Sequence, residues 1–318
     1  MSPTALQTAE EYPLVSIAMC TYNGAPYLQQ QIDSLFLQNY PNIEIIAVDD
    51  ASNDNTKQIL EENAARDSRF RFYFNKTNVG YNRNFENAIQ LCSGQYIAIS
   101  DQDDIWEADK ITEMMSLWPT GSSFIYSLSG TFLNDEFKNR TPPPHVVYTD
   151  IDDVHKLVFN SPVHGHACMF KKELAVLSMP FPADKIYYDW WLSMYAAANG
   201  FVGYVPKILS WHRIHEKNSS KTILSIKDRN LRNEQLRQQS VQAIETFCNR
   251  NVLKQQDKDS LLQYVSILKA MDGEKFSWPM FRYIFTNRKK VFHYKKKKPF
   301  IIFSHIKRAI RMGYSGVL

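Results

Sequence analysis

Apolar and polar positions alternate with two different periods along the first 120 residues. Four short apolar runs predict β-strands at residues 14–20, 43–48, 70–74 and 96–100. Between them, mostly apolar residues recur every three or four positions, which predicts helices that bury one face. The residues on this face are Leu28, Ile32, Leu35 and Phe36 in the first helix, Thr56, Ile59, Leu60 and Ala64 in the second, and Phe85, Ala88, Ile89 and Cys92 in the third. Repeated strand–helix units predict an α/β fold with a mostly parallel central sheet.

The pattern changes in the second half of the chain. A helix is predicted to run to Ala198, followed by a strand at residues 202–210. Beyond residue 220, helical spacing predicts a packed helical subdomain, with apolar positions at Leu224, Leu231, Leu236, Val241, Ile244, Phe247, Leu261, Leu262, Val265 and Leu268. The sequence therefore predicts an α/β region over residues 1–219 and a helical extension over residues 220–318.

Polar residues gather where three of the predicted strands end. They are Thr21, Tyr22 and Asn23 after the first strand, Asp49 and Asp50 after the second, and Asp101, Asp103 and Asp104 after the fourth. Ligands of parallel sheets bind beyond the carboxyl ends of the strands, so these groups are expected to form one site. Asp and Asn are also ordinary turn and capping residues, an alternative of equal weight for Asp49 and Asp50. Three carboxylates within the run DQDD stay ionised together only near a cation or in open water, which indicates Mg²⁺ or Mn²⁺.

Two common phosphate-binding motifs are missing, since no GxGxxG follows the first strand and no GxxxxGK[ST] occurs. The chain does contain PLVSIAMCTYNGAPYLQQQIDSLFLQNYPNIEIIAVDDASNDNT, then NVGYNRNFENAI and GQYIAISDQDDIW. These stretches resemble the start of a family 2 glycosyltransferase of the GT-A fold. The resemblance covers residues 14–118, continues more weakly through GHACMFKKEL, YYDWWLSMYAAANGFVGYVPKILSWHRIH and Asn218, and leaves the C-terminal region outside it.

The resemblance implies a Rossmann-like GT-A catalytic domain over residues 1–219, with a nucleotide-sugar half at 14–118 and an acceptor half at 119–219. It also implies an inverting transferase that uses a nucleotide-sugar donor and extends a lipid-linked or polysaccharide acceptor of the bacterial surface. The forms DQDDIW and DWWL are similar to bacterial rhamnosyltransferases acting from dTDP-rhamnose, with hexoses from UDP as the alternative. A nucleotide-sugar or polyanion binding protein without turnover is the hypothesis from another class, because fold does not determine function.

Position by position, the resemblance implies a role for individual side chains. Donor-binding residues would be Cys20, Thr21, Asn23, Asp50, Asn84, Asp101 and Arg213, with Asp50 accepting a hydrogen bond from the base and Asp101 nearer the ribose. Asp103 would hold the metal that bridges the diphosphate, with His215 as a second ligand. Acceptor-binding residues would be Gly165, His166, Trp190 and Trp191. Asp104 matches a common extra acid of this subgroup.

Asp189 in YYDWWL is the expected general base. Inversion requires a carboxylate beside the acceptor hydroxyl to take its proton. The neighbouring aromatic residues Tyr188, Trp190 and Trp191 suit stacking on sugar rings and would raise the pKa of the carboxyl by partial burial. The alternative is that Asp189 only caps the helix that runs to Ala198. A protein that merely binds the donor would not need this base.

Six of the eight histidines lie between His145 and His215. The closely spaced His164 and His166 suggest zinc as one alternative, because alternate residues of a strand share a face. The resemblance favours a different role for the run HRIH. Arg213, His215 and Asn218 match an R-x-H-x-x-N pattern, which implies a loop that closes over the donor diphosphate.

The formal net charge of +4 conceals an asymmetry. Residues 275–318 contain 12 of the 37 Lys and Arg residues and no acidic residue, so 25 basic side chains face 33 acidic ones in the rest of the chain. Cations such as Lys295–Lys298 interleave with Phe and Ile, which is typical of a segment that lies on an anionic bilayer. Nucleic-acid binding is the competing interpretation. A lipid-linked acceptor favours the membrane, and no nucleic-acid partner is expected.

The cysteines, the lengths of the apolar runs and the N-terminal segment indicate in which cell compartment the protein resides. Cys20, Cys92, Cys168 and Cys248 show no CxxC spacing, which predicts buried thiols in a reducing environment. No apolar run approaches the roughly 20 residues of a membrane span. The N-terminus has neither the basic nor the apolar region of a signal peptide. These features predict a cytoplasmic protein, peripheral to the inner face of the cell membrane.

Overall fold

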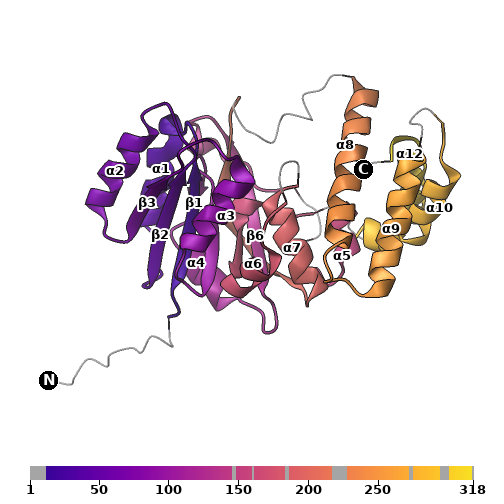
Figure 1. The fold of residues 1–318 in the computed structure, drawn as a ribbon, viewed down its shortest axis with the longest axis horizontal. Helices are drawn as coiled ribbons and strands as arrows, with labels where there is room; N and C mark the ends of the chain where they lie inside the picture. The colour runs from indigo at the N-terminus through magenta and orange to yellow at the C-terminus, as the bar shows by residue number, and fades with distance from the viewer. Residues whose placement is uncertain are drawn as a thin grey trace.

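The computed structural model describes residues 12–144, 148–159, 161–182, 186–216, 228–271, 275–293 and 301–316. Within them, an eight-stranded sheet has the strand order β3-β2-β1-β4-β7-β6-β8-β5. Figure 1 shows this sheet with helices packed on it and a further group of helices at one end of the molecule. The predicted α/β class and the C-terminal helical extension are confirmed.

The N-terminal half follows the predicted alternation closely. Its strands are β1 (Val15–Thr21), β2 (Ile43–Asp49), β3 (Phe70–Phe74) and β4 (Tyr96–Ser100), and they pair in parallel. The helices between them are α1 (Ala25–Phe36), α2 (Thr56–Arg66) and α3 (Tyr81–Leu91). Every residue of β1 and β2 is buried, because helices cover both faces of a parallel sheet.

Alternate residues of β1 enter two different hydrophobic cores. Ile17 and Met19 pack on the face that α1 covers, whereas Ala18 and Cys20 pack on the face that α3 covers. This period of two is the geometry of a strand between two helical layers. The four cysteines are buried and free, as predicted.

The second half of the sheet is mixed. It contains β5 (Ile105–Trp106), β6 (Phe124–Leu133), β7 (Cys168–Lys171) and β8 (Val202–Ile214), where β7 runs antiparallel to β4 and β6, and β5 antiparallel to β8. Its helices are α4 (Lys110–Ser116), α5 (Val154–Phe159), α6 (Lys172–Ser178) and α7 (Tyr188–Ala198), with short 3₁₀ turns η1 (Phe137–Asn139) and η2 (Gly165–Ala167). The strand predicted at 202–210 is longer than expected, because its pairing with β6 continues to Ile214. His212 and Arg213 therefore lie within a strand and not in a loop after it.

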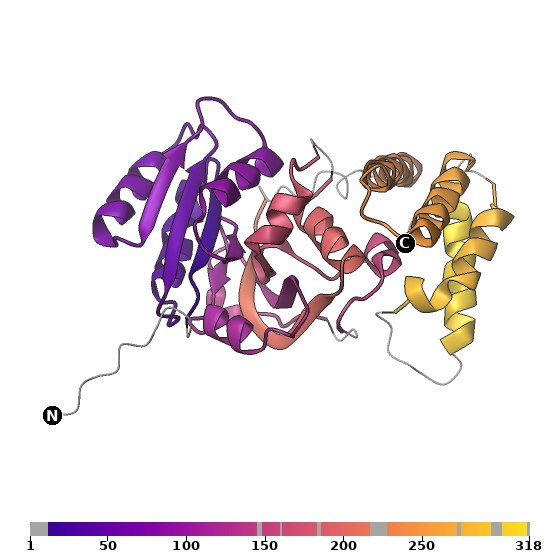
Figure 2. The ribbon, with the colours of Figure 1, turned by 60° about the horizontal axis from the view of Figure 1, so that its bottom comes forward.

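The C-terminal helices are α8 (Arg229–Cys248), α9 (Gln255–Lys269), α10 (Trp278–Thr286), α11 (Arg288–Val291) and α12 (Ile301–Ser315). Figures 1 and 2 show them at the end of the molecule opposite β3. Phe247 of α8 and Met312 of α12 belong to the same core cluster as α7, so these helices pack onto the sheet region. No helix in the described ranges is both long enough and apolar enough to cross a membrane. Asn218 and Lys295–Lys298 lie outside the described residues.

Candidate functional site

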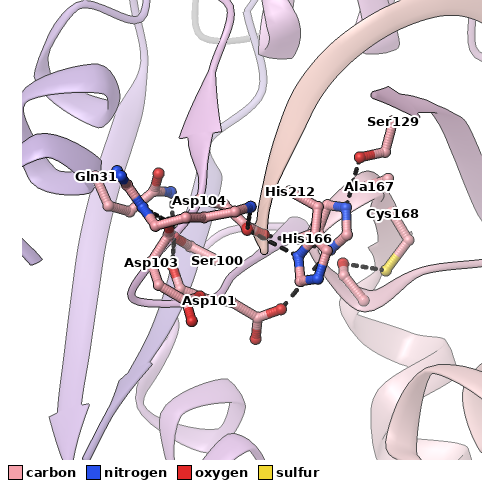
Figure 3. Close-up of polar contacts among 12 residues, drawn as sticks. Gln31, Ser100, Asp101, Asp103, Asp104, Ser129, His166, Ala167, Cys168 and His212 are labelled. Atoms are coloured by element: carbon pink, nitrogen blue, oxygen red, sulfur yellow. Dashed lines mark hydrogen bonds and ion pairs between the residues drawn. The ribbon is translucent and has the colours of Figure 1, made fainter. Parts of the chain in front are cut away.

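The DQDD run forms the short loop between β4 and β5, at the carboxyl end of the parallel strands. The Gln31 side-chain amide donates to Ser100 Oγ over 2.8 Å, and Ser100 Oγ donates to the Asp101 carbonyl over 3.1 Å (Figure 3). The Gln102 side chain accepts from the Tyr22 N–H at 2.8 Å and donates to the Tyr22 carbonyl at 3.1 Å. The loops that follow β1 and β4 are therefore joined directly, as the strand-end rule predicts.

Carboxylates crowd one another in this loop. Burial and the neighbouring Asp104 and Asp103 charges raise the pKa of Asp101 well above its usual value. Burial and Asp104 also raise the pKa of Asp103. His215 follows β8 directly, and its Nε2 lies 2.8 Å from Asp103 Oδ2. The structure thus brings together the two residues expected to hold a metal, and a carboxylate beside an imidazole in a site of excess negative charge suits a divalent cation.

Arg213 does not take the role expected for it. Its side chain is fully buried beneath the loop. The guanidinium donates to the Asp103 carbonyl at 2.8 Å, to Gln30 Oε1 at 2.6 Å and to Asp135 Oδ1 at 2.9 Å. Arg213 lies within β8 and not in a loop, and these hydrogen bonds hold its guanidinium inside the protein. Its hydrogen bond to the Asp103 carbonyl holds the backbone of the DQDD loop in place.

Asp104 is fully buried and lies between two histidines (Figure 3). His212 Nδ1 is 3.0 Å from Asp104 Oδ1, and His166 Nδ1 is 3.3 Å from Asp104 Oδ2. The two imidazole rings are stacked, with 5.1 Å between their centres. Burial disfavours the charged forms of both Asp104 and His212, but their interaction outweighs it. The two histidines lower the pKa of Asp104 to about 2, and the hydrogen bond to Asp104 raises the pKa of His212 to about 9. Burial lowers the pKa of His166 to about 3.

Asp189 lies in the first turn of α7, and the helix cap is Tyr187. Burial raises the pKa of Asp189 to about 6, although the backbone amides of Trp190 and Gly165 favour its charged form. The raised pKa predicted from the sequence is confirmed. The negative charge of Asp189 acts on Asp101, which puts this carboxyl within electrostatic range of the DQDD loop.

The two tryptophans that follow Asp189 face away from the loop, contrary to expectation. Trp191 is fully buried, and its indole N–H donates to the Ser178 carbonyl over 2.9 Å. The Trp190 indole N–H donates to the Leu157 carbonyl over 3.2 Å, and its ring packs on the hydrophobic core. Successive residues of a helix point about 100° apart, so while the Asp189 carboxylate interacts with the Gly165 amide the next two side chains turn into the core.

A cavity of about 390 Å³ opens beside η2. Its polar lining consists of Ser127, Ser129, Thr131, Thr141, Tyr148 and His164. Gly165 is the next residue, and a Cβ at this position would stand 2.1 Å from the Tyr188 hydroxyl, so only glycine lets η2 lie against α7. His166 is 6% exposed and does not itself line this cavity; its Nε2 lies 2.7 Å from Ser129 Oγ, which does.

Asn23 and Thr21 connect the loops on the expected donor side. Asn23 is exposed with a φ of 48°, its N–H donates to Ser52 Oγ, and its Oδ1 accepts from the Asn53 N–H, both over 2.8 Å. Thr21 is buried and donates to Asp49 Oδ1 over 2.8 Å. These contacts align the ends of β1 and β2.

Three other expected donor ligands are used inside the protein. The buried Asp50 carboxylate accepts from the Asn75 side chain and from the Val79 and Gly80 N–H groups at 2.8 to 3.0 Å. Asn84 is buried, donates to the Val48 carbonyl and accepts from Asn75. Cys20 lies in the core, where burial raises the pKa of its thiol. The side chains of Asn84 and Cys20 contact neighbouring protein groups, and Asp50 has about one lone-pair site left for a base.

Lys110 is a residue of this site that sequence analysis missed. Its side chain is fully buried at the start of α4, donates to the His166 carbonyl, and lies 3.4 Å from the centre of the Trp106 ring. Burial lowers the pKa of Lys110 to about 7, although the charges of Asp104 and Asp101 act in the opposite direction. A lysine at the start of a helix is ordinarily exposed, so the only signal was its closeness to the DQDD run.

A family model, curated relatives and solved structures were compared with the chain, and they agree with one another. The family model described as Glycosyl transferase family 2 matches residues 16–176. The chain is 30% identical over 181 residues to the UDP-Glc:alpha-D-GlcNAc-diphosphoundecaprenol beta-1,3-glucosyltransferase WfgD of Escherichia coli, which covers 56% of this chain and 68% of that protein. Other curated relatives are matched over 31 to 68% of their own length.

Two solved structures share the fold. S. aureus TarS, crystallised in complex with UDP-GlcNAc, has a TM-score of 0.59 at 16% identity and covers 95% of this chain and 90% of its own. The mannosyltransferase PcManGT from Pyrobaculum calidifontis, in complex with GDP-Man and Mn²⁺, has a TM-score of 0.56 at 16% identity over 95% of this chain and 86% of its own. These likenesses identify the GT-A fold. Because the family model spans half of the chain and includes the DQDD loop, the chain belongs to glycosyl transferase family 2.

Proposed function

We propose that this chain is an inverting glycosyltransferase that moves a sugar from a nucleotide-sugar donor to a lipid-linked or polysaccharide acceptor in bacterial surface glycan synthesis. The observation that supports this most is the relation of Asp189 to the DQDD loop. A carboxyl with a pKa of about 6 lies within electrostatic range of a loop whose carboxylates suit a cation-bound diphosphate. The E. coli relative is named for a UDP-linked sugar donor and a diphosphoundecaprenol acceptor, which are substrates of this kind.

In the proposed reaction, an acceptor hydroxyl attacks C1 of the donor sugar from the face opposite the nucleoside diphosphate. The new C1–O bond forms as the bond from C1 to the diphosphate oxygen breaks, and this displacement inverts the configuration at C1. The hydroxyl proton passes to the Asp189 carboxylate. A pKa of about 6 keeps Asp189 largely ionised at neutral pH, so it is ready to accept that proton.

Asp103 and His215 are the protein ligands we propose for Mg²⁺ or Mn²⁺. The fit rests on their 2.8 Å contact and on the raised pKa values of Asp101 and Asp103, which report a site that favours added positive charge. When bound, the ion would neutralise charge on the leaving diphosphate. Arg213 keeps the Asp103 backbone in place for this role. Asp101 would face the ribose.

The donor we would test first is dTDP-rhamnose, with UDP-hexoses second. The acceptor would approach from the side of Gly165, where the cavity of about 390 Å³ is lined by Ser and Thr hydroxyl groups, Tyr148 and four prolines. Hydroxyl and aromatic side chains suit recognition of sugar rings.

We also propose that the C-terminal region binds the inner face of the cell membrane. Phe303, Ile310 and Tyr314 share one face of α12 with Lys307, and their exposures are 66, 43 and 54%. Trp278 of α10 is 70% exposed, and both it and Tyr314 make edge-to-face contacts with Phe276, which joins the two helices into one apolar surface. Apolar side chains beside cations match the chemistry of an anionic bilayer.

A panel of nucleotide sugars tests the proposed function. Thermal unfolding of the wild type with Mn²⁺ should rise with one class of donor, because a bound ligand stabilises the folded state. Transfer of that sugar to a diphospho-lipid acceptor should then be measured for the wild type and for Asp189→Asn. Donor binding without any transfer would instead indicate the non-catalytic binder.

A further inference from the structure

Asp104, His166 and His212 form a side-chain cluster that the proposed reaction does not use. One ligand atom of each lies within 4.8 Å of the other two. The three residues come from the DQDD loop, from η2 and from β8, and Figure 3 shows their polar atoms pointing toward one another. Asp104 and His166 are buried, whereas the His212 side chain is 31% exposed. An ion could therefore enter from the His212 side.

The two carboxylate oxygens of Asp104 differ in their hydrogen bonds. Its Oδ1 lies 3.0 Å from both His212 Nδ1 and the Arg213 N–H nitrogen. Its Oδ2 is buried and makes no hydrogen bond within the described part of the chain. Each carboxylate oxygen buried without a partner costs free energy. The atom closest to Oδ2 in this cluster is His166 Nδ1, at 3.3 Å, yet the geometry is not that of a hydrogen bond.

Each ring nitrogen of His166 has a polar neighbour. Nε2 lies 2.7 Å from Ser129 Oγ, and that hydroxyl also lies 3.2 Å from the Gly130 carbonyl. Ser129 can therefore accept from Nε2–H while it donates to Gly130. In this tautomer the lone pair of Nδ1 faces Asp104 Oδ2, and a cation between the two atoms would satisfy both.

We propose that Asp104, His166 and His212 hold a divalent transition-metal ion of the Zn²⁺ type, at a site distinct from the one that Asp103 and His215 would form. Two imidazoles and one carboxylate are a ligand set that favours Zn²⁺ over Mg²⁺. Ser129 would orient His166 through its second nitrogen, which is the usual outer contact of a metal-bound histidine. His212 becomes a ligand by releasing the Nδ1 proton that it shares with Asp104. Asp101 Oδ2 is 3.8 Å from His166 Nδ1, too far for a shared hydrogen bond, and a water would complete the ligand set.

A metal ion at this site would stabilise the folded chain. The ion would connect three segments that are far apart in the sequence, namely the DQDD loop, η2 and β8. Since binding to the folded state alone stabilises it, Zn²⁺ should raise the unfolding temperature of the full chain. The site stands independently of the proposed transfer reaction, because neither the donor nor Asp189 takes part in it.

Cobalt spectroscopy tests this site without an activity assay. The full chain is stripped of metal and titrated with Co²⁺, whose visible absorption bands report low-coordinate imidazole ligation, and Zn²⁺ content after dialysis is measured in parallel. The wild type should bind one such Co²⁺ that Zn²⁺ displaces and excess Mg²⁺ does not. His166→Gln and His212→Gln should each lose the bands and weaken Zn²⁺ binding at least tenfold.

Two matched variants separate this site from its neighbours. His164→Gln changes a ring that stacks on His166 with 5.7 Å between centres but is not a ligand, and it should keep the bands. Asp103→Asn removes the expected donor-metal ligand and should also keep them. If the wild type retains no Zn²⁺ or shows no bands, or if the bands survive both His166→Gln and His212→Gln, the proposal is wrong. Bands lost in Asp103→Asn alone would overturn it as well, by assigning the ion to the donor site. Circular dichroism of each variant checks folding. If His166→Gln does not fold, His212→Gln still tests the site, because the His212 side chain is 31% exposed.

Discussion

Asp103 and His215, 112 residues apart in the sequence, meet with carboxylate oxygen and imidazole nitrogen 2.8 Å apart. Each is held by its own support. The Tyr27 ring of α1 packs against the His215 ring with 4.6 Å between centres, and the Arg213 guanidinium donates to the Asp103 carbonyl. The pair is therefore oriented by the fold before any ligand arrives, and outer contacts of this kind set the geometry of metal ligands.

Asp103→Asn should reduce sugar transfer about 100-fold or more and weaken donor binding in the presence of Mn²⁺. The reason is that a bound cation contributes several kcal/mol to stabilising the leaving group, and about 1.4 kcal/mol corresponds to tenfold in rate. Calorimetric donor titration and a transfer assay measure the two effects. Asp259→Asn on α9, which changes an exposed carboxylate far from the loop, is the control. Full activity of Asp103→Asn, or of the wild type in EDTA, would contradict the metal assignment.

Asp189→Asn should lower kcat by roughly 10²–10⁴ while donor affinity stays within about twofold, because the amide keeps the shape and removes the base. Steady-state kinetics and equilibrium donor binding separate the two quantities. A parallel collapse of donor affinity would place Asp189 in the donor site or in the fold.

The pH dependence of transfer should show an acid limb near pH 6, since burial raises the pKa of Asp189 to about 6. The base acts in its ionised form, so kcat/KM should fall about tenfold for each unit below that pH and level off above it. The same profile recorded for Asp189→Asn should lack the limb. A limb that persists in this variant would belong to another group, such as Asp101.

Lys110→Met should destabilise the protein by about 1–3 kcal/mol, because it leaves the buried His166 carbonyl without its donor while keeping most of the packing. Urea unfolding followed by circular dichroism gives this difference. Lys258→Met, on α9, supplies a comparison at a position with ordinary solvent access. Equal unfolding free energies for Lys110→Met and the wild type would show that the contact contributes nothing to stability.

Membrane binding should depend on the exposed face of α12. The double variant Phe303→Gln, Ile310→Gln should weaken co-sedimentation with anionic vesicles at least tenfold, because burying a large apolar side chain contributes about 1.5–3 kcal/mol. Val176→Gln with Leu177→Gln removes equally exposed apolar residues from α6 and should have no effect. Binding by the wild type should also weaken as salt rises.

These surface variants are preferable to truncating the chain near Thr286. Val291, Phe292, Ala309 and Met312 are buried in the core cluster, so truncation would expose that core. Transfer to a soluble acceptor analogue should be unchanged in the α12 variant. Unaltered sedimentation of the α12 variant would show that this face does not contact lipid.

Local periodicity was enough to predict the N-terminal half of the fold. The bounds of β3 and β4 agree with the predicted ranges, and β1 and β2 differ from them by one residue. Each of these strands is long enough to show its period, and each is separated from the next by an amphipathic helix. By contrast, β5 has two residues and β7 four, which is too short for any period, and their antiparallel pairing depends on distant strands.

The same distinction holds for the site. The sequence by itself determined that Asp101, Asp103 and Asp104 follow a strand and that Asp189 stands among aromatic residues at a helix start, because these are properties of neighbouring residues. Only the tertiary structure decided which side chains face the loop. Trp191 packs edge-on against Phe247 with 5.4 Å between ring centres, Arg213 is buried under Asp103, and Asp104 meets two histidines from other segments. Burial and contact between such distant positions depend on how helices and strands pack, and the alternation of polar and apolar residues within one element carries no information about that.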